Sequence, residues 1–284
     1  MDNVLELHNV TKDYGDFKLD NVSISVKKGG ICGFIGQNGA GKTTTIKLIL
    51  DIIKKDAGEI KVFDKDMEKD GKELKERIGV VYDEMGFHDF LTPKNLNKVF
   101  KNIYKGWDEE DFFDYMKRFS LPVNKKCGDF SRGMRMKLQI AVAMSHNAEL
   151  LIMDEPTSGL DPIVRTEILQ IFQEFVMDEN HTILFSSHIT GDLERIADEV
   201  IFINGGKIII TGNKDELLES HGIIKCSAEE LKNIDADDIV GVRSSSVCEE
   251  VMVRNKTACM TKYPGLVMDQ ASLEELLIFN VLKG

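Results

Sequence analysis

A glycine-rich loop, residues 36–43 with the sequence GQNGAGKT, is the first candidate site for chemistry. It matches the pattern G-x-x-x-x-G-K-[ST], in which glycines let the backbone curl so that successive N–H groups face an anion. In this pattern Lys42 reaches the β- and γ-phosphates and the hydroxyl of Thr43 ligates Mg²⁺. The loop therefore predicts a site for a polyphosphate and its metal ion.

The surroundings of the loop decide whether this match is a coincidence. Four such fixed positions recur by chance in about one or two chains in a hundred of this length. Here an apolar strand, residues 31–35, leads into the loop, and residues 43–53 have helical spacing, with Ile46, Ile49 and Ile53 on one face. A helix that starts at the loop adds its positive end to the anion site. Strand, loop and helix in this order make chance much less probable.

Two carboxylates follow a second apolar run. Residues 150–153 read LLIM, and Asp154 and Glu155 come directly after them. A buried parallel strand delivers its C-terminal residues to the ligand edge of a sheet. Asp154 is then placed to bind Mg²⁺ through water, and Glu155 to orient or deprotonate an attacking water. The alternative is a strand that runs into an acidic turn, which is common, but the phosphate loop upstream strengthens the chemical interpretation.

The elements that must position these residues alternate between strands and helices, which predicts a parallel α/β sheet. A mostly helical stretch, residues 84–147, interrupts this alternation and is expected to be an insertion. We expect one domain over residues 1–221, with 84–147 as a helical subdomain, and a small α/β appendage over 222–284. The expected strands cover 4–10, 22–26, 31–35, 150–153, 182–185, 200–203 and 207–211, and the expected helices cover 96–104, 108–119, 131–145, 164–177, 192–197, 213–221 and 272–282.

Composition narrows the classes of function. The 284 residues include 36 Lys and Arg against 48 Asp and Glu, a net charge of −12, which disfavours general binding to nucleic acid. The five cysteines are odd in number, scattered and without a CxxC pair, which disfavours a disulfide framework or a zinc site. The start lacks the pattern of a secretory signal, and no window approaches the roughly 18 apolar residues of a membrane helix.

Beyond these sites, the order of further motifs resembles the ABC-type ATPases. The run PTSGLD, residues 156–161, follows Glu155 like a Walker B motif and its D-loop, and FSRGM, residues 130–134, resembles the signature LSGGQ. His188, in the run FSSH, matches the switch histidine, and Tyr14 matches the aromatic residue on which adenine stacks. The resemblance covers about residues 3–220. It implies a P-loop NTPase fold of the ABC type that binds ATP and Mg²⁺.

The resemblance also implies roles for single residues. Two ATPase domains close head to tail around two ATPs, and Ser131 and Gly133 of one subunit touch the γ-phosphate held by the other. Asp161 helps to couple the two sites, and His188 contacts the γ-phosphate, although a histidine at a strand end, taken alone, is more often a surface residue. Ser131 is expected to be a helix N-cap, which would leave free N–H groups facing the anion. The loop residues expected at the nucleotide are Gly36, Asn38, Gly39, Ala40, Gly41, Lys42, Thr43 and Thr44.

The chain departs from the family pattern at two places. The signature carries Arg132 for the usual first glycine and Met134 for the usual glutamine, while Ser131 and Gly133 are retained. The Q-loop glutamine is replaced by Asp83, which could meet Mg²⁺ directly or through water but could not donate a hydrogen bond when ionised. The alternative is that Asp83 and Glu84 form a solvated turn.

The resemblance implies the ATPase subunit of a transporter at the cytoplasmic face of the cell membrane. Its partners would be a separate integral membrane permease and a second ATPase subunit, in a homodimer or a heterodimer. The run FSRGM and the short tail, residues 276–284, resemble bacterial ABC-2-type exporters, whose relatives handle antimicrobial peptides, drugs, lipids or sodium. The alternatives are a soluble ABC ATPase of DNA maintenance or translation, which would need sustained heptads or a second ATPase domain, and a P-loop kinase or GTPase, which would leave the signature and His188 unexplained.

Overall fold

A central sheet of six strands holds the candidate site. The computed structural model describes residues 3–84, 86–245 and 247–282. The strand order is β10-β9-β3-β8-β7-β6, and the neighbours from β9 to β6 run parallel, while β10 pairs with β9 antiparallel. The bounds are β3 Gly30–Ile35, β6 Ile78–Val81, β7 Leu150–Asp154, β8 Thr182–Ser187, β9 Glu199–Asn204 and β10 Lys207–Asn213. The predicted parallel sheet is confirmed.

The register of this sheet brings three strand ends together. Ile35 of β3 lies opposite Ser187 of β8, and Asp154 of β7 lies opposite Ser186 of the same strand. Strands β7 and β8 are buried along their whole length. The phosphate loop after β3, the carboxylates after β7 and the segment after β8 therefore meet at one edge, as parallel strands require.

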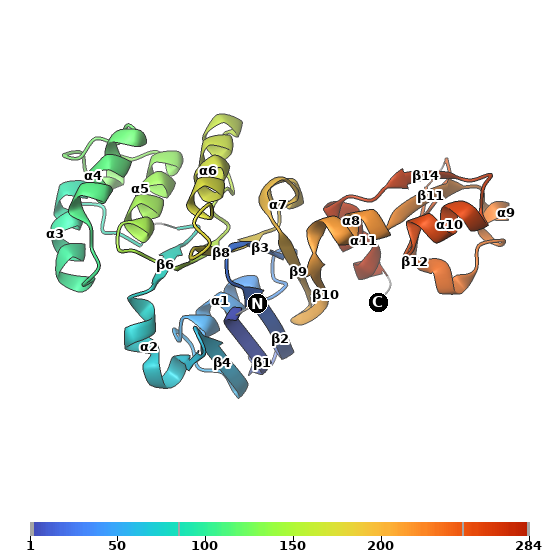
Figure 1. Cartoon of the computed structure of the whole chain (residues 1–284), viewed down its shortest axis with the longest axis horizontal. Coiled ribbons are helices and arrows are strands. Elements are labelled where there is room, and N and C mark those ends of the chain that lie inside the picture. Colours follow the sequence, from blue (N-terminus) through green and yellow to red (C-terminus); the bar gives the residue numbers. More distant parts are fainter. Residues whose placement is uncertain (1–2, 85, 246, 283–284) are drawn as a thin grey trace.

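A second, antiparallel sheet at the N-terminal part of the chain packs beside the central one (Figure 1). Its order is β2-β1-β4-β5, and its strands were expected only in part, since the sequence pattern gave no strand between residues 57 and 66. The bounds are β1 Asn3–Asp13, β2 Lys18–Lys27, β4 Ala57–Val62 and β5 Lys65–Asp66, and the helix α2, Met67–Lys75, follows β5. Val4, Leu7 and Ile24 of this sheet share a core with Ile46 and Ile49 of the helix after the phosphate loop.

Helices α3, α4 and α5 form the group at the end of the molecule opposite the C-terminus (Figure 1). They lie between β6 and β7 in the sequence, so the predicted helical insertion into the sheet is confirmed. The bounds are α1 Lys42–Ile49, α3 Pro93–Ile103, α4 Glu109–Arg118, α5 Arg132–Met144, α6 Pro162–Phe175 and α7 Thr190–Ile196. The helix after the phosphate loop was expected to reach residue 53, but it ends at Ile49, because the backbone turns into the left-handed region at Asp51, with φ 53°.

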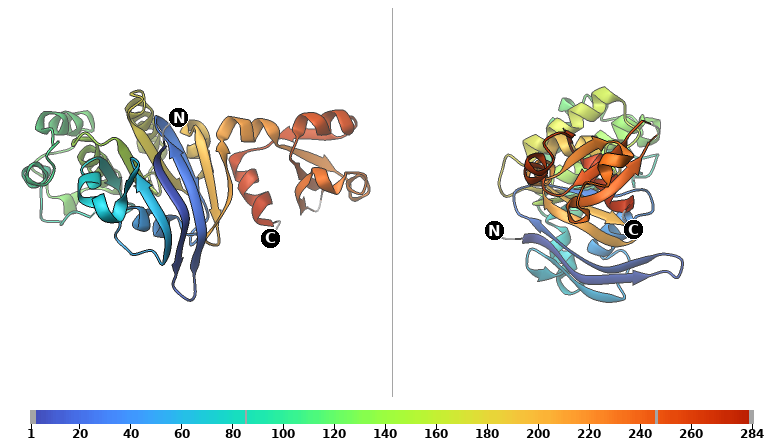
Figure 2. Two further views of the ribbon diagram at one scale, coloured as in Figure 1. Left: turned by 60° about the horizontal axis from the view of Figure 1, so that its bottom comes forward. Right: turned by 90° about the vertical axis from the view of Figure 1, so that its right-hand side faces the viewer.

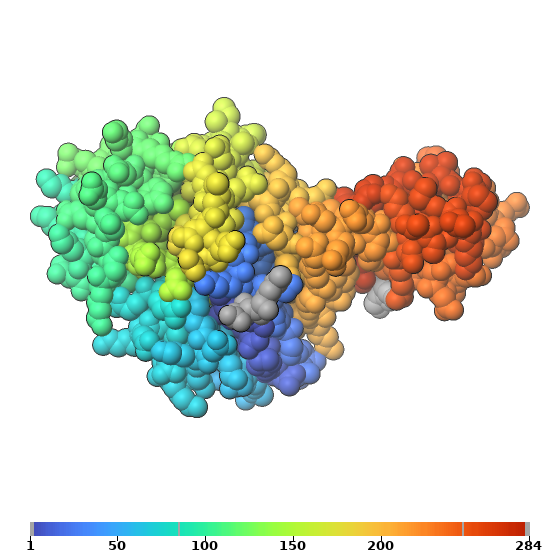
Figure 3. All heavy atoms as spheres, viewed as in Figure 1, coloured from blue at the N-terminus to red at the C-terminus, as the bar shows by residue number. Residues whose placement is uncertain are grey.

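The C-terminal residues form a lobe of their own (Figures 1 and 3). A four-stranded antiparallel sheet, in the order β12-β13-β11-β14, makes up this small α/β appendage. The bounds are α8 Lys214–Ser220, β11 Gly222–Cys226, α9 Ala228–Leu231, β12 Ile239–Ser244, β13 Glu249–Val253, α10 Lys256–Lys262, β14 Val267–Gln270 and α11 Leu273–Leu282. A short 3₁₀ turn at Ala236–Asp238 precedes β12, and another, at Cys127–Asp129, lies between α4 and α5.

Helix α11 packs this lobe against the rest of the molecule (Figure 2). Leu276 and Phe279 are fully buried and belong to the same apolar cluster as Leu193 of α7. The backbone N–H of Leu273 also donates to the Glu194 carboxylate of α7 at 3.1 Å. Because α7 begins two residues after His188, this packing connects the lobe to the segment that carries the candidate histidine.

Leu276→Ala is expected to lower the free energy of unfolding by about 2–5 kcal/mol, the cost of removing a fully buried leucine side chain. Urea denaturation followed by circular dichroism would measure this. Met260→Ala on α10 is the control, because Met260 is 54% exposed and its replacement is expected to change stability by less than about 0.5 kcal/mol. Equal urea midpoints for the two variants would contradict the proposed role of α11 in the core.

Candidate nucleotide-binding site

The loop between β3 and α1 is shaped around the ammonium of Lys42. Its Nζ donates to the carbonyl oxygens of Gly36 at 2.6 Å and of Gln37 at 3.3 Å, so the side chain folds back across the loop. Gly41, the residue before α1, has φ 115°, which side chains rarely allow. A Cβ on Gly36 would lie 2.5 Å from the carbonyl oxygen of Ile203, so this position also requires glycine. The loop is therefore held in a curled form with a cation at its centre.

The carboxylate of Asp154 is held by two hydroxyl groups. Thr43 donates to its Oδ2 at 2.8 Å, and Ser186 donates to its Oδ1 at 2.6 Å. Thr43 lies in the first turn of α1, Asp154 ends β7, and Ser186 lies near the end of β8, so three neighbouring elements supply the group. Thr43 and Asp154, which were each expected at Mg²⁺, contact each other in the structure.

Glu155 lies between a lysine and a histidine. Its Oε1 is 3.1 Å from Nζ of Lys42, and its Oε2 is 2.8 Å from Nδ1 of His188, whose backbone N–H also points at this oxygen at 3.3 Å. The Glu155 side chain is only 13% exposed. Its backbone has φ 54°, and its N–H donates to the carbonyl of Ser186 at 3.1 Å, which turns the chain sharply away from β7. The structure thus brings Lys42, Glu155 and His188 together at the edge predicted for them.

Oxygen ligands at this edge suit Mg²⁺. This ion keeps several waters and is bound through one or two protein oxygens plus substrate phosphates. A hydroxyl from Thr43 and a carboxylate from Asp154, already in contact, fit that requirement. Within the described ranges no group of three or more His, Cys, Asp and Glu side chains is arranged to hold a metal ion.

The start of α5 has the expected N-cap. Ser131 has an extended backbone, and its hydroxyl accepts from the N–H of Met134 at 3.3 Å. The first turn of α5, which is described in full, contains no acidic residue and begins with Arg132. A Cβ on Gly133 would lie 3.3 Å from Val164, so this glycine allows α5 to approach the start of α6 closely. The predicted N-cap is confirmed, and no contact joins Ser131 or Gly133 to Lys42 among the described residues.

The remaining predicted residues lie around this edge or at a distance from it. Tyr14 follows β1, is 53% exposed, and has the Lys12 ammonium 5.6 Å from its ring centre. Asp161 caps α6, since its carboxylate accepts from the N–H groups of Ile163 and Val164. Asn38, Gly39 and Thr44 belong to the loop or the first turn of α1, and Ala40 is buried within the loop.

Asp83 contacts Arg132 and not the predicted metal site. Nη2 of Arg132 lies 2.5 Å from Oδ1 of Asp83, and no hydrogen bond or ion pair joins Asp83 to Thr43 or Asp154 in the part of the chain that the structure describes. Nearby, burial raises the pKa of the Tyr82 hydroxyl, and the charge of Asp154 raises it further. The expectation that Asp83 meets Mg²⁺ stays a prediction.

Sequence reasoning missed two polar side chains in this region. Ser186 was visible in the run FSSH before His188, and its place one residue ahead of the strand end was the available signal. Gln139 of α5 is buried, and it bonds the backbone of Tyr82 in both directions, at 3.3 Å and 3.0 Å. Nothing in the sequence pattern of a helix marks such a residue.

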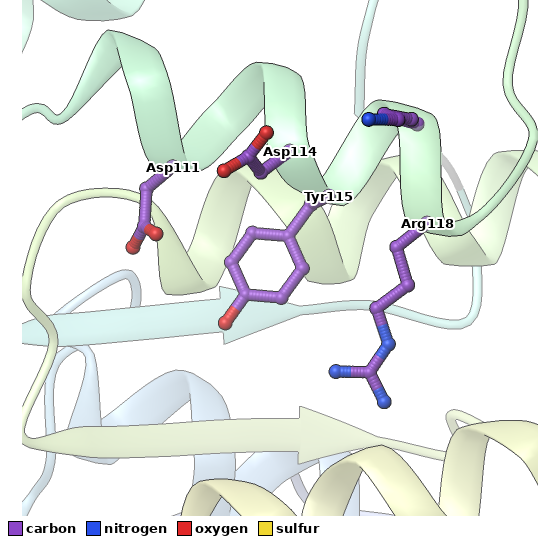
Figure 4. A pocket seen from close by; sticks show the side chains of 5 residues that line it. Asp111, Asp114, Tyr115 and Arg118 are labelled. Atoms are coloured by element: carbon purple, nitrogen blue, oxygen red, sulfur yellow. The ribbon is translucent and has the colours of Figure 1, made fainter.

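A separate hollow of about 550 Å³ lies along α4 and contains none of the predicted site residues (Figure 4). Tyr115 and Arg118 line it together with Asp111, Asp114 and Lys117. Arg118 pairs with Glu174 of α6 at 2.5 Å. Since both acidic and basic side chains line this surface, its charge favours no particular ligand.

Comparison with known proteins gives consistent matches. A family model described as ABC transporter matches residues 19–158. The bacitracin transport ATP-binding protein BcrA of Bacillus licheniformis is 38% identical over 213 residues, which cover 74% of this chain and 69% of BcrA. The ABC transporter ATP-binding protein NatA of Bacillus subtilis (strain 168) is 38% identical over 207 residues, which cover 70% of this chain and 83% of NatA.

A solved structure of an ATP-binding subunit of an ABC transporter matches this chain with a TM-score of 0.67 at 25% sequence identity. The match covers 75% of this chain and 91% of the chain in that structure.

No helix among residues 3–84, 86–245 and 247–282 is long and apolar enough to cross a membrane.

Proposed function

The chain belongs to the ABC transporter family as an ATP-binding subunit, and from this membership we propose that it hydrolyses ATP to power transport, in the direction of export, by a separate integral membrane protein. The observation that carries the proposal is the arrangement of Lys42, Glu155 and His188 beside the Thr43–Asp154 pair. A cation suited to phosphate, a mostly buried carboxylate suited to an attacking water, and a hydroxyl and a carboxylate suited to a metal ion lie at one edge of the sheet, which supports the proposal.

Lys42 and the loop would bind the phosphates of ATP. Its ammonium now bonds the carbonyls of Gly36 and Gln37 and faces Glu155, and phosphate oxygens would take over as its acceptors. The curled loop supplies N–H groups, and the start of α1 supplies the positive end of its dipole. Tyr14, whose ring is exposed, would stack on the adenine.

Glu155 would orient the attacking water and accept its proton. The carboxylate is mostly buried and held by His188, so its direction is fixed before substrate binds. Mg²⁺, bound by Thr43 and Asp154, would neutralise the charge of the phosphates. His188 is 39% exposed, so it can reach a γ-phosphate while it keeps Glu155 in place.

A second ATPase subunit would complete each site. Ser131 and Gly133, at the N-terminus of α5, make no contact with Lys42 among the described residues, so they are free to meet the nucleotide of a facing copy. Asp161 would lie near this interface at the start of α6. The proposal is a head-to-tail dimer, either of two copies of this chain or of this chain with a related subunit.

The membrane partner would dock on the helical region. Apolar side chains are exposed there: Phe90 is 66% exposed, Val99 41% and Ile103 56%. Isolated exposed apolar residues are common, but a group of them on one subdomain suits a protein interface. This arrangement would place the chain at the cytoplasmic face of the membrane, with the Asp83 segment between the nucleotide and the docked partner.

We also propose the division of the chain into an ABC ATPase domain over residues 1–221, with 84–147 as its helical subdomain, and a C-terminal appendage over 222–284. The support is the separate antiparallel sheet, which begins with β11 at Gly222, and the apolar cluster of its own that includes Ile224, Val251 and Cys259.

The test of the proposed function is recovery of the membrane partner. A tagged Glu155→Gln protein, loaded with MgATP, would be captured from detergent-solubilised membranes of the source organism and read by mass spectrometry. The proposal expects a protein with several membrane spans in stoichiometric amount. Lys42→Ala, which should not bind ATP, is the matched control. Recovery of soluble partners alone with the ATP-bound dimer would overturn the transport role.

A further inference from the structure

Asp83 and Arg132 stand at the two places where the chain departs from the motifs of its family, and they contact each other. Nη2 of Arg132 is 2.5 Å from Oδ1 of Asp83. The two side chains come from different elements, since Asp83 follows β6 and Arg132 is the first residue of α5. Asp83 adds a negative charge where the family has a neutral glutamine. Arg132 adds a positive charge where the family has a glycine, so the two changes compensate each other in charge.

A second contact joins α5 to the segment that follows β6. The Gln139 amide, on α5, donates to the carbonyl of Tyr82 at 3.0 Å, and its oxygen accepts from the Tyr82 N–H at 3.3 Å. Gln139 is only 4% exposed, so this contact is protected from water. The backbone of residue 82 and the side chain of residue 83 are therefore both fixed to α5.

Arg132 also lies against the segment that follows Glu155. A Cβ on Gly159 would come within 2.9 Å of Cζ of Arg132, so the guanidinium occupies the space that the glycine leaves open. A cavity of about 490 Å³ remains beside the pair, lined by Asp83, Glu84 and Arg132 among others. Arg132 is thus placed between the Asp83 segment and the loop of residues 156–161.

We propose that Asp83 acts as the positioning partner of Arg132, so that the ion pair sets the orientation of Arg132 at the start of α5. Asp154, in contrast, is held by Thr43 and Ser186, and Asp83 makes no contact with this group in the described residues. An arginine in the first turn of a helix is unfavourable to the helix dipole, and the neighbouring carboxylate offsets this.

The Asp83–Arg132 ion pair affects the orientation of the Arg132 side chain more than the free energy of folding. The side chains are 49% and 46% exposed, and exposed ion pairs add little to the free energy of folding. The inference rests on the proposed function, because Arg132 lies between Ser131 and Gly133, which are proposed to face the nucleotide of the second subunit. Arg132 in the orientation set by Asp83 would favour closure of the dimer. Asp83 would therefore affect closure only through Arg132.

The experiment measures the ATP concentration at which half of the Glu155→Gln chain dimerises, by sedimentation velocity at fixed Mg²⁺. Asp83→Asn and Arg132→Gln are each expected to raise this concentration about twofold to fivefold, the range of an exposed ion pair. The double variant is expected to show no more than the larger single effect, because Asp83 acts only through Arg132. Asp83→Asn is expected to leave the Mg²⁺ concentration for half-maximal dimerisation unchanged.

Arg118→Gln and Glu174→Gln provide a matched control, since this pair has the same 2.5 Å distance and similar exposure, 45% and 39%, and lies on α4 and α6. Neither should change dimerisation, and melting temperatures should stay close to that of the Glu155→Gln chain in all variants. Two results would overturn the inference and leave the proposed function intact. One is a double variant in which the two single effects on the ATP concentration multiply. The other is a higher Mg²⁺ requirement in Asp83→Asn. If ATP drives no dimerisation at all, the proposed dimer fails and the inference fails with it.

Discussion

The Glu155→Gln protein is expected to hydrolyse ATP about 10²- to 10⁴-fold more slowly than the unchanged chain, the contribution of a positioned general base. Glutamine has nearly the same size, and its amide oxygen can still accept from Nδ1 of His188, which lies 2.8 Å from the carboxylate. It cannot take a proton from water. Because the geometry is kept and the base is lost, binding of ATP should survive while turnover falls.

Phosphate release at saturating MgATP would measure this loss, and sedimentation velocity would show whether ATP-bound dimers accumulate. Glu149→Gln is a matched control, because Glu149 immediately precedes the same strand, β7, at its other end, and pairs with Arg77 at 2.5 Å and 2.7 Å, away from the site. That variant should keep its turnover. Nearly full activity in Glu155→Gln would show that Glu155 is not the base.

The predictable part of the site depends on local sequence. The phosphate loop and the carboxylates after β7 are short contiguous runs, and parallel strands place their carboxyl ends at one edge. The contact between Thr43 and Asp154 follows from these two facts. The position of Glu155 between Lys42 and His188 could not be predicted in this way. It depends on the left-handed backbone of Glu155, whose φ is 54°, and a glutamate in the sequence does not indicate such a backbone.

The pair of Asp83 and Arg132 shows a different limit. Each residue was recognisable as a departure from a motif, but the two departures are far apart in the sequence. Only the packing of α5 beside β6, with Gln139 fixed to Tyr82, brings them together. A contact between residues that are far apart in the sequence has no characteristic spacing, so a sequence pattern cannot predict it.

The C-terminal sheet was the least predictable part of the fold. Its strands are short, and their order in space, β12-β13-β11-β14, does not follow the order in the sequence. Strand β11 pairs with both β13 and β14, so each of its sides depends on residues well downstream. The closing helix was predictable, because apolar residues such as Leu273, Leu276 and Leu277 recur at helical spacing and are buried.

Lys42→Ala is expected to weaken ATP binding about 100-fold or more, because truncation of one partner of a buried charge pair costs several kcal/mol. The Lys42 side chain is only 5% exposed and faces Glu155 at 3.1 Å. Its removal takes away the cation for the phosphates and also leaves the Glu155 carboxylate beside the incoming anion without compensation. Both effects act against binding, whereas Glu155→Gln removes a negative charge and should not weaken it.

Equilibrium titration with a fluorescent ATP analogue would measure the change, with circular dichroism to show that the variant is folded. Lys47→Ala is the matched control, since Lys47 lies on the exposed side of the same helix, α1, and its loss removes the same charge without touching the loop. Its affinity should stay within about twofold of the unchanged chain. Equal affinities for the two lysine variants would mean that net charge, and not the loop, governs binding. The opposite responses expected from Lys42→Ala and Glu155→Gln separate binding from turnover at a single pair of contacting side chains.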